Sequence, residues 1–360
     1  MLKVAVVGAT GAVGKALLAI LAERKFPVGE LVPFASERSV GKEIAFQGKH
    51  YKCQALKKGC FAGTDIAFFD ASDAVSKEWV PEAASAGAWV IDNSATFRLE
   101  DGVLLLVPEV NGHLLQARIQ KGVKNLQPRE RILTGPNCST VQMVVALKPI
   151  RDQWGLKRVV VSTYQSTSGA GAAAMDELSE ATQAALTQAG QGVHPQKAFA
   201  HGIAFNCIPH IGGFGPSGPM EGYTSEELKM MAESRKLLEL PQLRISPTAV
   251  RVPTYSCHGE SINVECDRPV TADQARAALK AQPGVILQDE PGQKTYPMGN
   301  PGKSSHVEGA SGRDAVYVGR VRQDPSVEHG LNLWVVSDNL RKGAALNAIQ
   351  IGEMVVQSLR

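Results

Sequence analysis

The first 24 residues contain the pattern that most limits how this chain can fold. A short apolar run, Lys3–Val7, comes first. Glycines follow at Gly8, Gly11 and Gly14, and an Ala- and Leu-rich stretch covers residues 15–24. This order predicts a buried strand, a tight turn and a helix, because glycine lets the backbone approach a pyrophosphate and a helix N-terminus offers free N–H groups. The pattern favours a dinucleotide-binding α/β domain, although similar turns also join strands to helices that bind nothing.

Strand-like and helix-like segments alternate through the next part of the chain. A helical pattern, Ser76–Ala86, lies between two apolar runs typical of buried strands. Such alternation predicts a parallel sheet with helices on both faces, a Rossmann-type fold. The predicted strands are Glu30–Phe34, Asp65–Phe69 and Ala88–Asp92.

The pattern changes after Cys138, where helices and alternating strands are mixed. Thr224 and Thr271 each precede a helical stretch, and Glu227 and Gln274 follow them at the spacing of a capping box. We therefore expect an α/β (α+β) domain in this half of the chain. Its other predicted elements are helices over 139–147, 172–189 and 340–359 and strands over 157–164, 261–266, 315–321 and 331–336.

The composition excludes several classes of protein. The 38 Lys and Arg residues nearly balance the 35 Asp and Glu residues, whereas a dedicated nucleic-acid binder carries a strong basic excess. The longest apolar runs, such as Val103–Val107, are far shorter than the ~20 residues that span a bilayer. Six cysteines without a Cys-x-x-Cys pair are typical of a reducing compartment. We therefore expect a cytoplasmic protein with no nucleic-acid, membrane or metal partner.

The end of the second predicted strand bears on the choice of dinucleotide. Arg38 lies 24 residues after Gly14, near the place where an NAD site carries an acid for the ribose 2′-hydroxyl. A guanidinium with hydroxyls beside it, such as that of Ser39, suits a 2′-phosphate and favours NADP. Glu37 could instead bind the ribose of NAD, and a solvated loop is a third interpretation.

The segment Gly135–Thr140 is the most informative part of the sequence. Pro136 biases the residue before it away from helix, and the residues after the cysteine are typical of a helix start. Cys138 is therefore predicted at or just before a helix N-terminus, where a thiol pKa falls and the nucleophilic thiolate is favoured. The Asn137 amide could stabilise an oxyanion formed on attack. The remaining cysteines are interpreted as small buried apolar residues: Cys53, Cys60, Cys207, Cys257 and Cys266.

A cysteine nucleophile needs a base, and His258 is the candidate. It leads into a predicted strand and could lie at a strand edge that faces a cleft. Arg251 comes seven residues earlier, and an odd spacing within one regular strand places two side chains on opposite faces. Both can reach one site only if a bulge or turn intervenes. A surface histidine is the alternative interpretation.

Three further charged residues could bind anions or a zwitterion. Arg98 follows a predicted strand, at the edge where parallel sheets bind ligands, and suits a phosphate or carboxylate. Glu226 and Lys229 are three residues apart on one predicted helix and share a face. They could bind the opposite charges of a substrate, or they could form a solvated pair.

These residues occur in an order that resembles the bacterial aspartate-semialdehyde dehydrogenase family over essentially the whole chain. Any one match could arise by chance, but the shared order is highly specific. The matching segments are Gly8–Gly14, Asn93–Arg98, Gly135–Thr140, Tyr164–Gly171, Glu226 with Lys229, Arg251–Ser261 and Ser337–Ala345.

The resemblance implies a role for each candidate residue. Cys138 would form a thioester, and His258 would be the acid/base. The residues implied to bind substrate are Gln165, Arg251, Glu226 and Asn137, and those implied to bind phosphate are Arg98 and Lys229. The implied NADP(H) contacts are Gly8, Thr10, Gly11, Ala12, Val13, Arg38, Ser39, Ser168, Gly169 and Asn339.

The resemblance also implies a reaction and an architecture. The reaction would be NADPH-dependent reduction of 4-phospho-L-aspartate to L-aspartate 4-semialdehyde and phosphate, which feeds lysine, methionine, threonine and diaminopimelate synthesis. An NADP-binding domain would use residues 1–137 and the C-terminal helix 340–360, and residues 138–339 would form a catalytic and dimerisation domain. A homodimer is expected, with a tetramer as the alternative.

Three rival functions share parts of this pattern. An N-acetyl-γ-glutamyl-phosphate reductase has less use for an acid such as Glu226, which would bind a free amine. A catalytically silent NADP-binding paralogue should lack Cys138 or His258, and a cysteine hydrolase would not need the glycine turn. Two stretches, 116–131 and 254–257, depart from the family pattern, and the loop 291–312 is expected at a subunit interface or over the site.

Overall fold

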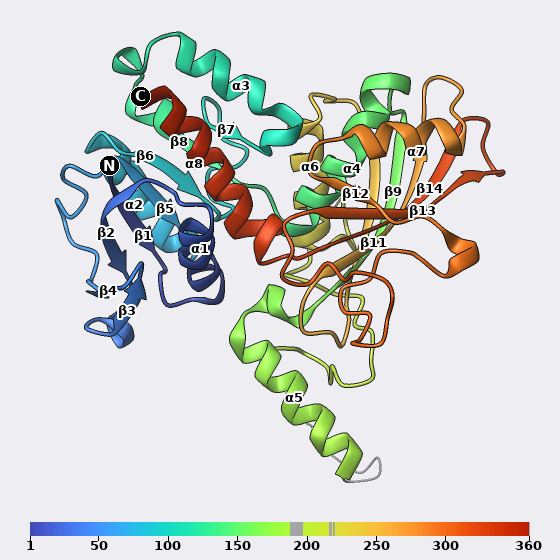
Figure 1. The fold of residues 1–360 in the computed structure, drawn as a ribbon, viewed down its shortest axis with the longest axis horizontal. Coiled ribbons are helices and arrows are strands. Elements are labelled where there is room, and N and C mark those ends of the chain that lie inside the picture. The colour runs from blue at the N-terminus through green and yellow to red at the C-terminus, as the bar shows by residue number, and fades with distance from the viewer. Residues whose placement is uncertain (188–196, 216–217, 219, 360) are drawn as a thin grey trace. The chain divides into compact units, whose positions relative to one another are not determined.

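The computed structural model describes residues 1–187, 197–215, 218 and 220–359. The chain folds into two units (Figure 1), one formed by Met1–Asn137 together with Ala344–Arg360 and the other by Cys138–Gly343. Each unit is built around its own six-stranded sheet. Among the described residues, no helix is both long and apolar enough to cross a bilayer.

The first unit contains a sheet whose paired strands are all parallel. In order across the sheet, the strands are β2 (Val28–Phe34), β1 (Leu2–Val7), β5 (Ile66–Phe69), β6 (Trp89–Asp92), β8 (Ile132–Thr134) and β7 (Leu104–Leu105). The helices are α1 (Ala12–Glu23), α2 (Asp73–Ser85), α3 (Pro108–Gln120) and α8 (Leu346–Leu359). A hairpin of β3 (Glu43–Phe46) and β4 (Lys49–Lys52) completes the unit.

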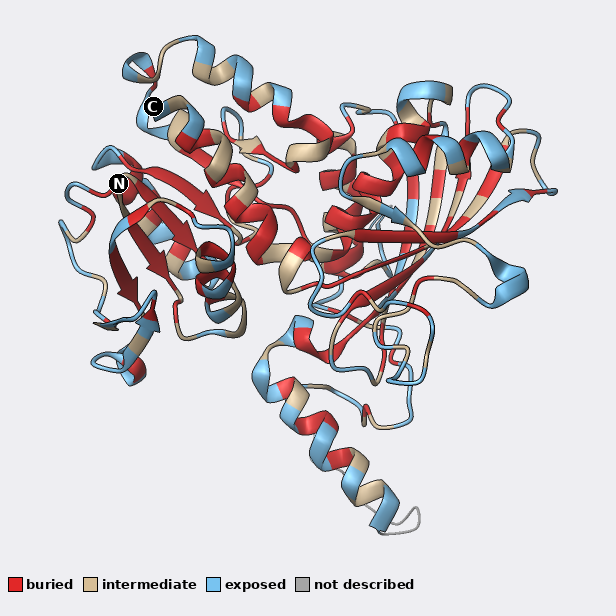
Figure 2. Cartoon of the chain, viewed as in Figure 1, coloured by how far each residue is buried: buried red, intermediate tan, exposed pale blue. Residues whose placement is uncertain are grey.

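Successive residues of β1 enter two separate apolar cores, because side chains alternate along a strand. Val4 and Val6 belong to the core that includes residues of α1 and α8. Ala5 and Val7 belong to the core on the side of α2. Figure 2 shows the central strands of this sheet as largely buried. Helices on both faces of a parallel sheet confirm the predicted Rossmann-type fold.

The second unit contains a mixed sheet with helices packed against it. In order, its strands are β10 (Arg244–Arg251), β9 (Arg158–Gln165), β11 (His258–Glu265), β14 (Gly330–Ser337), β13 (Val316–Asp324) and β12 (Val285–Leu287). The helices are α4 (Cys138–Trp154), α5 (Ala172–Thr187), α6 (Ser225–Leu237) and α7 (Ala272–Ala281). Helices α6 and α7 each pack on α4, and all three pack on the sheet, whereas α5 projects away from it (Figure 1). This is the predicted α/β (α+β) arrangement.

Several element boundaries differ from the sequence prediction. Helix α4 continues through Pro149 to Trp154 rather than ending near residue 147. The last helix begins at Leu346, after a π-helical turn at Arg341–Ala345. The last two residues of the helix predicted over 172–189 lie outside the described residues. Both predicted capping boxes, at Thr224 and Thr271, are present.

Candidate active site

The candidate nucleophile and base lie together in the second unit. Cys138 is the first residue of α4, and His258 is the first residue of β11. Cys138 Sγ lies 3.2 Å from Nε2 of His258, whose side chain is fully buried. Gly343 lies directly beside Cys138, where a Cβ on residue 343 would lie only 3.0 Å from Cys138 Cβ. A thiol at a helix N-terminus beside an imidazole is the arrangement of an activated cysteine nucleophile.

Arg251 and His258 reach one site because a turn separates them. Arg251 ends β10, and the turn before His258 contains Cys257 in the left-handed region, with φ of 70°. Strands β10 and β11 lie on either side of β9, where Arg251 is paired with Gln165. Because Arg251 and His258 lie on different strands, their odd spacing does not place the two side chains on opposite faces. His258 is buried, so the interpretation as a surface histidine is wrong.

The Arg251 guanidinium is buried next to the nucleophile. Its Nη1 donates a hydrogen bond to the backbone oxygen of Ser166 over 2.6 Å. Burial lowers the pKa of Arg251, while the charges of Cys138 and Glu226 act to raise it. A Cβ at Gly169 would lie 3.0 Å from Nη1 of Arg251 and 3.2 Å from Cε1 of His258. Glycine thus keeps the space beside both groups open.

Gln165 and Glu226 meet across the same site. Nε2 of Gln165 donates to Oε1 of Glu226 over 3.2 Å, although the two residues are 61 positions apart. The capping box at Thr224 fixes the start of α6 and so places Glu226 in its first turn. Glu226 is buried, so the solvated-pair interpretation is wrong for this residue. Lys229, one turn later, is half-buried.

A polar network holds the other side of the imidazole. The backbone N–H of Ser166 donates to Nδ1 of His258 over 3.1 Å. The Ser166 hydroxyl lies 3.2 Å from the same nitrogen and also donates to Oδ1 of Asn339. Nδ2 of Asn339 donates to the Ser168 hydroxyl over 2.9 Å. Burial, and next the charge of Arg251, lowers the pKa of His258 to about 3, so the ring is neutral.

The glycine turn of the first unit has no room for a side chain at Gly8 or at Gly14. Gly8 adopts φ of 89°, and a Cβ there would lie 1.9 Å from the backbone oxygen of Asp70. A Cβ at Gly14 would lie 2.2 Å from the Gly8 oxygen. Gly11 is the N-cap of α1, and no side chain caps this helix. The N–H groups of the first turn, which begins with Ala12 and Val13, are therefore not occupied by a capping side chain. Together with Thr10, this turn fits the pyrophosphate of a dinucleotide.

Polar residues follow both strands that flank β1. Arg38 and Ser39 lie in a short 3₁₀ turn after β2, with Arg38 exposed and Ser39 buried. Asp70 directly follows β5, and sequence reasoning missed it although it comes immediately after the predicted strand Asp65–Phe69. Burial raises the pKa of Asp70 to about 6, and the nearby Asp92 adds to the increase. Ligands bind at this carboxyl edge in doubly wound sheets.

Two of the segments that carry the family resemblance, Asn93–Arg98 and Gly135–Thr140, follow adjacent strands of the first sheet. Arg98 is buried after β6, and its Nη2 donates to the backbone oxygen of Asn93 over 2.6 Å. Gly135 follows β8, and a Cβ there would lie 2.9 Å from Oδ1 of Asn93. Asn137 is also buried. The parallel pairing of β6 with β8 therefore brings Asn93–Arg98 and the start of Gly135–Thr140 together.

The other cysteines follow the sequence interpretation only in part. Cys53, Cys257 and Cys266 are buried, and burial raises the pKa of Cys257 to about 12. Cys60 is half-buried, and Cys207 is exposed in an irregular segment, so the prediction for Cys207 is wrong. Within the described ranges, no three His, Cys, Asp or Glu side chains are grouped as ligands of a metal ion would be.

Comparison with known proteins identifies the family. Residues 3–118 match the family model "Semialdehyde dehydrogenase, NAD binding domain", and residues 147–342 match "Semialdehyde dehydrogenase, dimerisation domain". An aspartate-semialdehyde dehydrogenase of Aquifex aeolicus is 48% identical over 356 residues, which cover 99% of this chain and 98% of the relative. One from Bacillus subtilis is 43% identical over 359 residues, with 98% and 96% covered.

Solved structures agree with this assignment. The crystal structure of aspartate semialdehyde dehydrogenase II complexed with ASA from Vibrio cholerae is 42% identical and superposes with a TM-score of 0.87, covering 99% of this chain and 98% of that one. A probable aspartate-semialdehyde dehydrogenase from Pseudomonas aeruginosa is 30% identical, with a TM-score of 0.85 and 99% and 98% coverage. The chain therefore belongs to the aspartate-semialdehyde dehydrogenase family of oxidoreductases.

Proposed function

We propose that this chain catalyses the NADPH-dependent reductive dephosphorylation of 4-phospho-L-aspartate to L-aspartate 4-semialdehyde and phosphate. The observation that carries the proposal is the 3.2 Å approach of Cys138 Sγ to Nε2 of His258. The names of the relatives support the substrate, since each is an aspartate-semialdehyde dehydrogenase. The reaction would feed lysine, methionine, threonine and diaminopimelate synthesis in the cytoplasm, where a catalytic thiol stays reduced.

The proposed chemistry begins at Cys138. Its thiolate attacks the acyl carbon, a C–S bond forms, and phosphate leaves, so that a thioester results. NADPH, when bound, would supply the hydride for reduction of this thioester. His258 is proposed to hold a proton at Nε2, where it stabilises the oxyanion of each tetrahedral intermediate and then the departing thiolate. Collapse of the second intermediate breaks the C–S bond, releases the aldehyde and restores the thiolate.

The buried charges beside Cys138 support a zwitterionic substrate. Arg251 suits the α-carboxylate, because a guanidinium donates two parallel hydrogen bonds to such a group. Glu226 suits the α-ammonium, and Gln165 bonds to Glu226 from the neighbouring strand. An N-acetylated substrate has no positive charge for Glu226, which favours aspartyl phosphate over N-acetyl-γ-glutamyl phosphate. The proposal adds Asn137 as a further substrate contact and Arg98 and Lys229 as ligands of the phosphate.

The proposed cofactor residues lie in both units. In the first unit, the glycine turn would hold the pyrophosphate, and Arg38 with Ser39 would hold a 2′-phosphate, which favours NADP. In the second unit, the proposed contacts are Ser168, Gly169 and Asn339 beside His258. We accordingly assign NADP binding to residues 1–137 with the C-terminal helix, and catalysis and dimerisation to residues 138–339.

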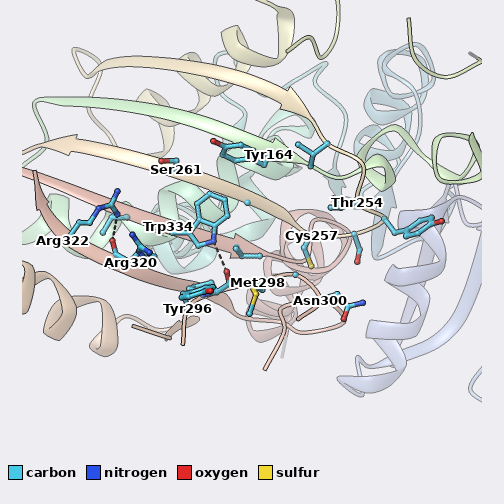
Figure 3. Close-up of a pocket in the computed structure, with 18 residues that line it drawn as sticks. Tyr164, Thr254, Cys257, Ser261, Tyr296, Met298, Asn300, Arg320, Arg322 and Trp334 are labelled. Carbon is cyan, nitrogen blue, oxygen red and sulfur yellow. Dashed lines mark hydrogen bonds between the residues drawn. The ribbon is translucent and has the colours of Figure 1, made fainter. Parts of the chain in front are cut away.

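The proposed homodimer uses the face of the second sheet that lies opposite α6. Gln165 faces Glu226 of α6, so its neighbour Tyr164 points to the other face, where it is 39% exposed and lies beside Trp334. A cavity of about 720 Å³ on this face is lined by Tyr164, Ser261 and Trp334 and by the loop residues 296–300 (Figure 3). Trp334 Nε1 donates to the Pro297 oxygen over 2.9 Å, so the loop borders this face.

The name of the matched dimerisation domain, which spans residues 147–342, supports this use of the face. Tyr164→Arg should therefore shift the molar mass measured by light scattering from dimer to monomer. The matched control is Leu359→Arg, an exposed apolar residue of the other unit, which should leave the mass unchanged. A monomeric wild type would contradict the proposed homodimer, and a mass of four chains would favour the tetramer.

Two assays test the proposed reaction. NADP reduction is followed with aspartate 4-semialdehyde and phosphate, and in parallel with N-acetylglutamate semialdehyde and phosphate. Turnover with the first substrate alone is expected. Cys138→Ala should abolish turnover while NADPH still binds, and the exposed-cysteine control Cys207→Ala should leave both unchanged. Turnover by Cys138→Ala would refute the thioester, and turnover only with the second substrate would favour the reductase of N-acetyl-γ-glutamyl phosphate.

A further inference from the structure

Glu260 is a fully buried carboxyl group next to the proposed catalytic pair. It lies two residues after His258 on β11, so the two side chains share one face of the strand. Its exposed fraction is 0%, and β11 packs against α4 on this side. The apolar residues Ile262 and Val264 continue the same face. A carboxyl group in such a position needs an explanation, because burying its charge costs several kcal/mol.

Gln142 connects this face to both members of the pair. It lies four residues after Cys138 on α4, so it occupies the same side of the helix one turn further on. Its Nε2 donates to the backbone oxygen of His258 over 3.2 Å. Its Oε1 accepts a hydrogen bond from the Ser337 hydroxyl over 2.6 Å, and Ser337 is the cross-strand partner of His258. Gln142 therefore links α4 to β11 and β14 by hydrogen bonds, close to the thiol and the imidazole.

The Glu260 carboxyl adjoins this amide, and its burial favours the neutral form. Burial raises its pKa well above the ordinary value, and the Gln142 side chain is the group that acts against this increase. Neither carboxyl oxygen forms a hydrogen bond of ordinary distance and angle with a described residue, although the Gln142 side chain is near enough to act on the carboxyl as a hydrogen-bonding neighbour. A protonated carboxyl group carries one O–H donor and keeps acceptor capacity, so it complements an amide with a spare proton and a spare lone pair. A negative charge here, about 7 Å along the strand from His258, would oppose a thiolate at Cys138.

We propose that Glu260 is a positioning residue that acts in its neutral, protonated form, by supporting Gln142 and thereby holding the His258 backbone against the start of α4. This inference rests on the proposed roles of Cys138 and His258. Because Gln142 bonds to the residue that carries the imidazole, loss of its support should move Nε2 relative to Sγ. Displacement of a catalytic group by an ångström costs up to about 100-fold in rate.

Substitutions of Glu260 separate the neutral role from a charged role. Glu260→Gln keeps the shape and hydrogen-bonding capacity without ionisation, whereas Glu260→Met keeps only the length. The control is Glu265→Gln, on the same strand but paired at the surface with Lys157. Two readouts are used: the pH dependence of Cys138 alkylation by iodoacetamide, which needs no substrate, and kcat and KM for semialdehyde oxidation. The alkylation readout tests the inference even if the proposed substrate is wrong.

Glu260→Gln should match the wild type and the control in both readouts. Glu260→Met should raise the apparent thiol pKa and lower kcat by about 10–100-fold with KM changed less than about twofold. The double variant that combines Glu260→Met with Gln142→Met should lose no more kcat than Gln142→Met alone, because both changes remove the same support. A thiol pKa lowered by Glu260→Gln would show that Glu260 is charged and would overturn the proposal, as would wild-type behaviour of Glu260→Met. If Glu260→Met does not fold, the Glu260→Gln profile decides alone.

Discussion

Ser166 sets the tautomer of His258. The Ser166 backbone N–H, which can only donate, lies 3.1 Å from Nδ1 of His258. Nδ1 is therefore the acceptor, and the single proton of the neutral ring lies on Nε2, the atom 3.2 Å from Cys138 Sγ. The thiol thus faces an N–H donor, which stabilises the thiolate. The pair needs no imidazolium, because the positive charge of Arg251 also acts on the sulfur.

The first prediction concerns the protonation state of His258. Burial lowers its pKa from 6.5 to about 3, so the ring should stay neutral with the proton on Nε2 between about pH 5 and pH 8. Folding favours the neutral ring, and this contribution to stability is complete above pH 6.5 and is lost as the pH falls towards 3. Two-dimensional long-range ¹H–¹⁵N spectra report the tautomer directly, with His258→Asn to assign the signal. A resonance of His258 that titrates near the ordinary histidine value would contradict the prediction.

The second prediction concerns Arg251. If its guanidinium binds the substrate carboxylate through two hydrogen bonds, Arg251→Lys should raise KM for aspartate 4-semialdehyde by about 10-fold or more, because an ammonium group lacks the planar fork. Steady-state kinetics with Arg244→Lys, an exposed residue of the same strand, provide the control. An unchanged KM with a reduced kcat would assign Arg251 to the support of Ser166 alone, since its Nη1 also bonds to the Ser166 oxygen.

Local sequence signals predicted the features that local physics determines. The strand–glycine turn–helix at the N-terminus, both capping boxes and the helix start at Cys138 depend on neighbours within a few residues. Strand β10 was missed because Pro247 lies within it, and proline is tolerated there because β10 is an edge strand. Its edge position is a property of the sheet, which the local pattern does not contain.

Contacts between distant residues were beyond the sequence pattern. The approach of Gln165 to Glu226 depends on how α6 packs against β10, the strand next to β9, and the convergence of Arg251 with His258 depends on strand order. Glu260 is different, because the alternation predicted for 261–266 extends backwards and places both Glu260 and His258 on the apolar face. That signal was present in the sequence and identifies a buried carboxyl beside the imidazole.

The third prediction tests the glycine turn by adding one methyl group. Gly8→Ala should lower the free energy of unfolding by about 3 kcal/mol or more, because the new Cβ overlaps the Asp70 backbone oxygen at 1.9 Å in addition to the cost of its positive φ. Gly63→Ala is the matched control, since Gly63 also has positive φ, 69°, but nothing lies within 4 Å of its Cβ position. The control should lose only about 1 kcal/mol. Equal losses in urea denaturation would mean that the close approach at Gly8 is not rigid.

The fourth prediction concerns the pH dependence contributed by Asp70. Burial raises its pKa from 3.8 to about 6. The negative charge of Asp92 raises the pKa further, whereas hydrogen bonds from the Asn93 side chain and the Gly14 backbone lower it. The folded state therefore holds a proton that the unfolded state has released between these values, and stability should fall as the pH rises from about 4 to about 6. A shift of this size corresponds to roughly 3 kcal/mol. Above pH 6 the folded protein carries this cost in full.

Asp70→Asn removes the ionisation, so its free energy of unfolding should rise relative to the wild type as the pH increases from 4 to 7 and then level off. The control Asp101→Asn, at an exposed turn, should show no such trend relative to the wild type. Denaturant titrations at a series of pH values measure both differences. A difference between Asp70→Asn and the wild type that does not change with pH would mean that Asp70 ionises at its ordinary value, and the turn beside it would then face a carboxylate throughout this range.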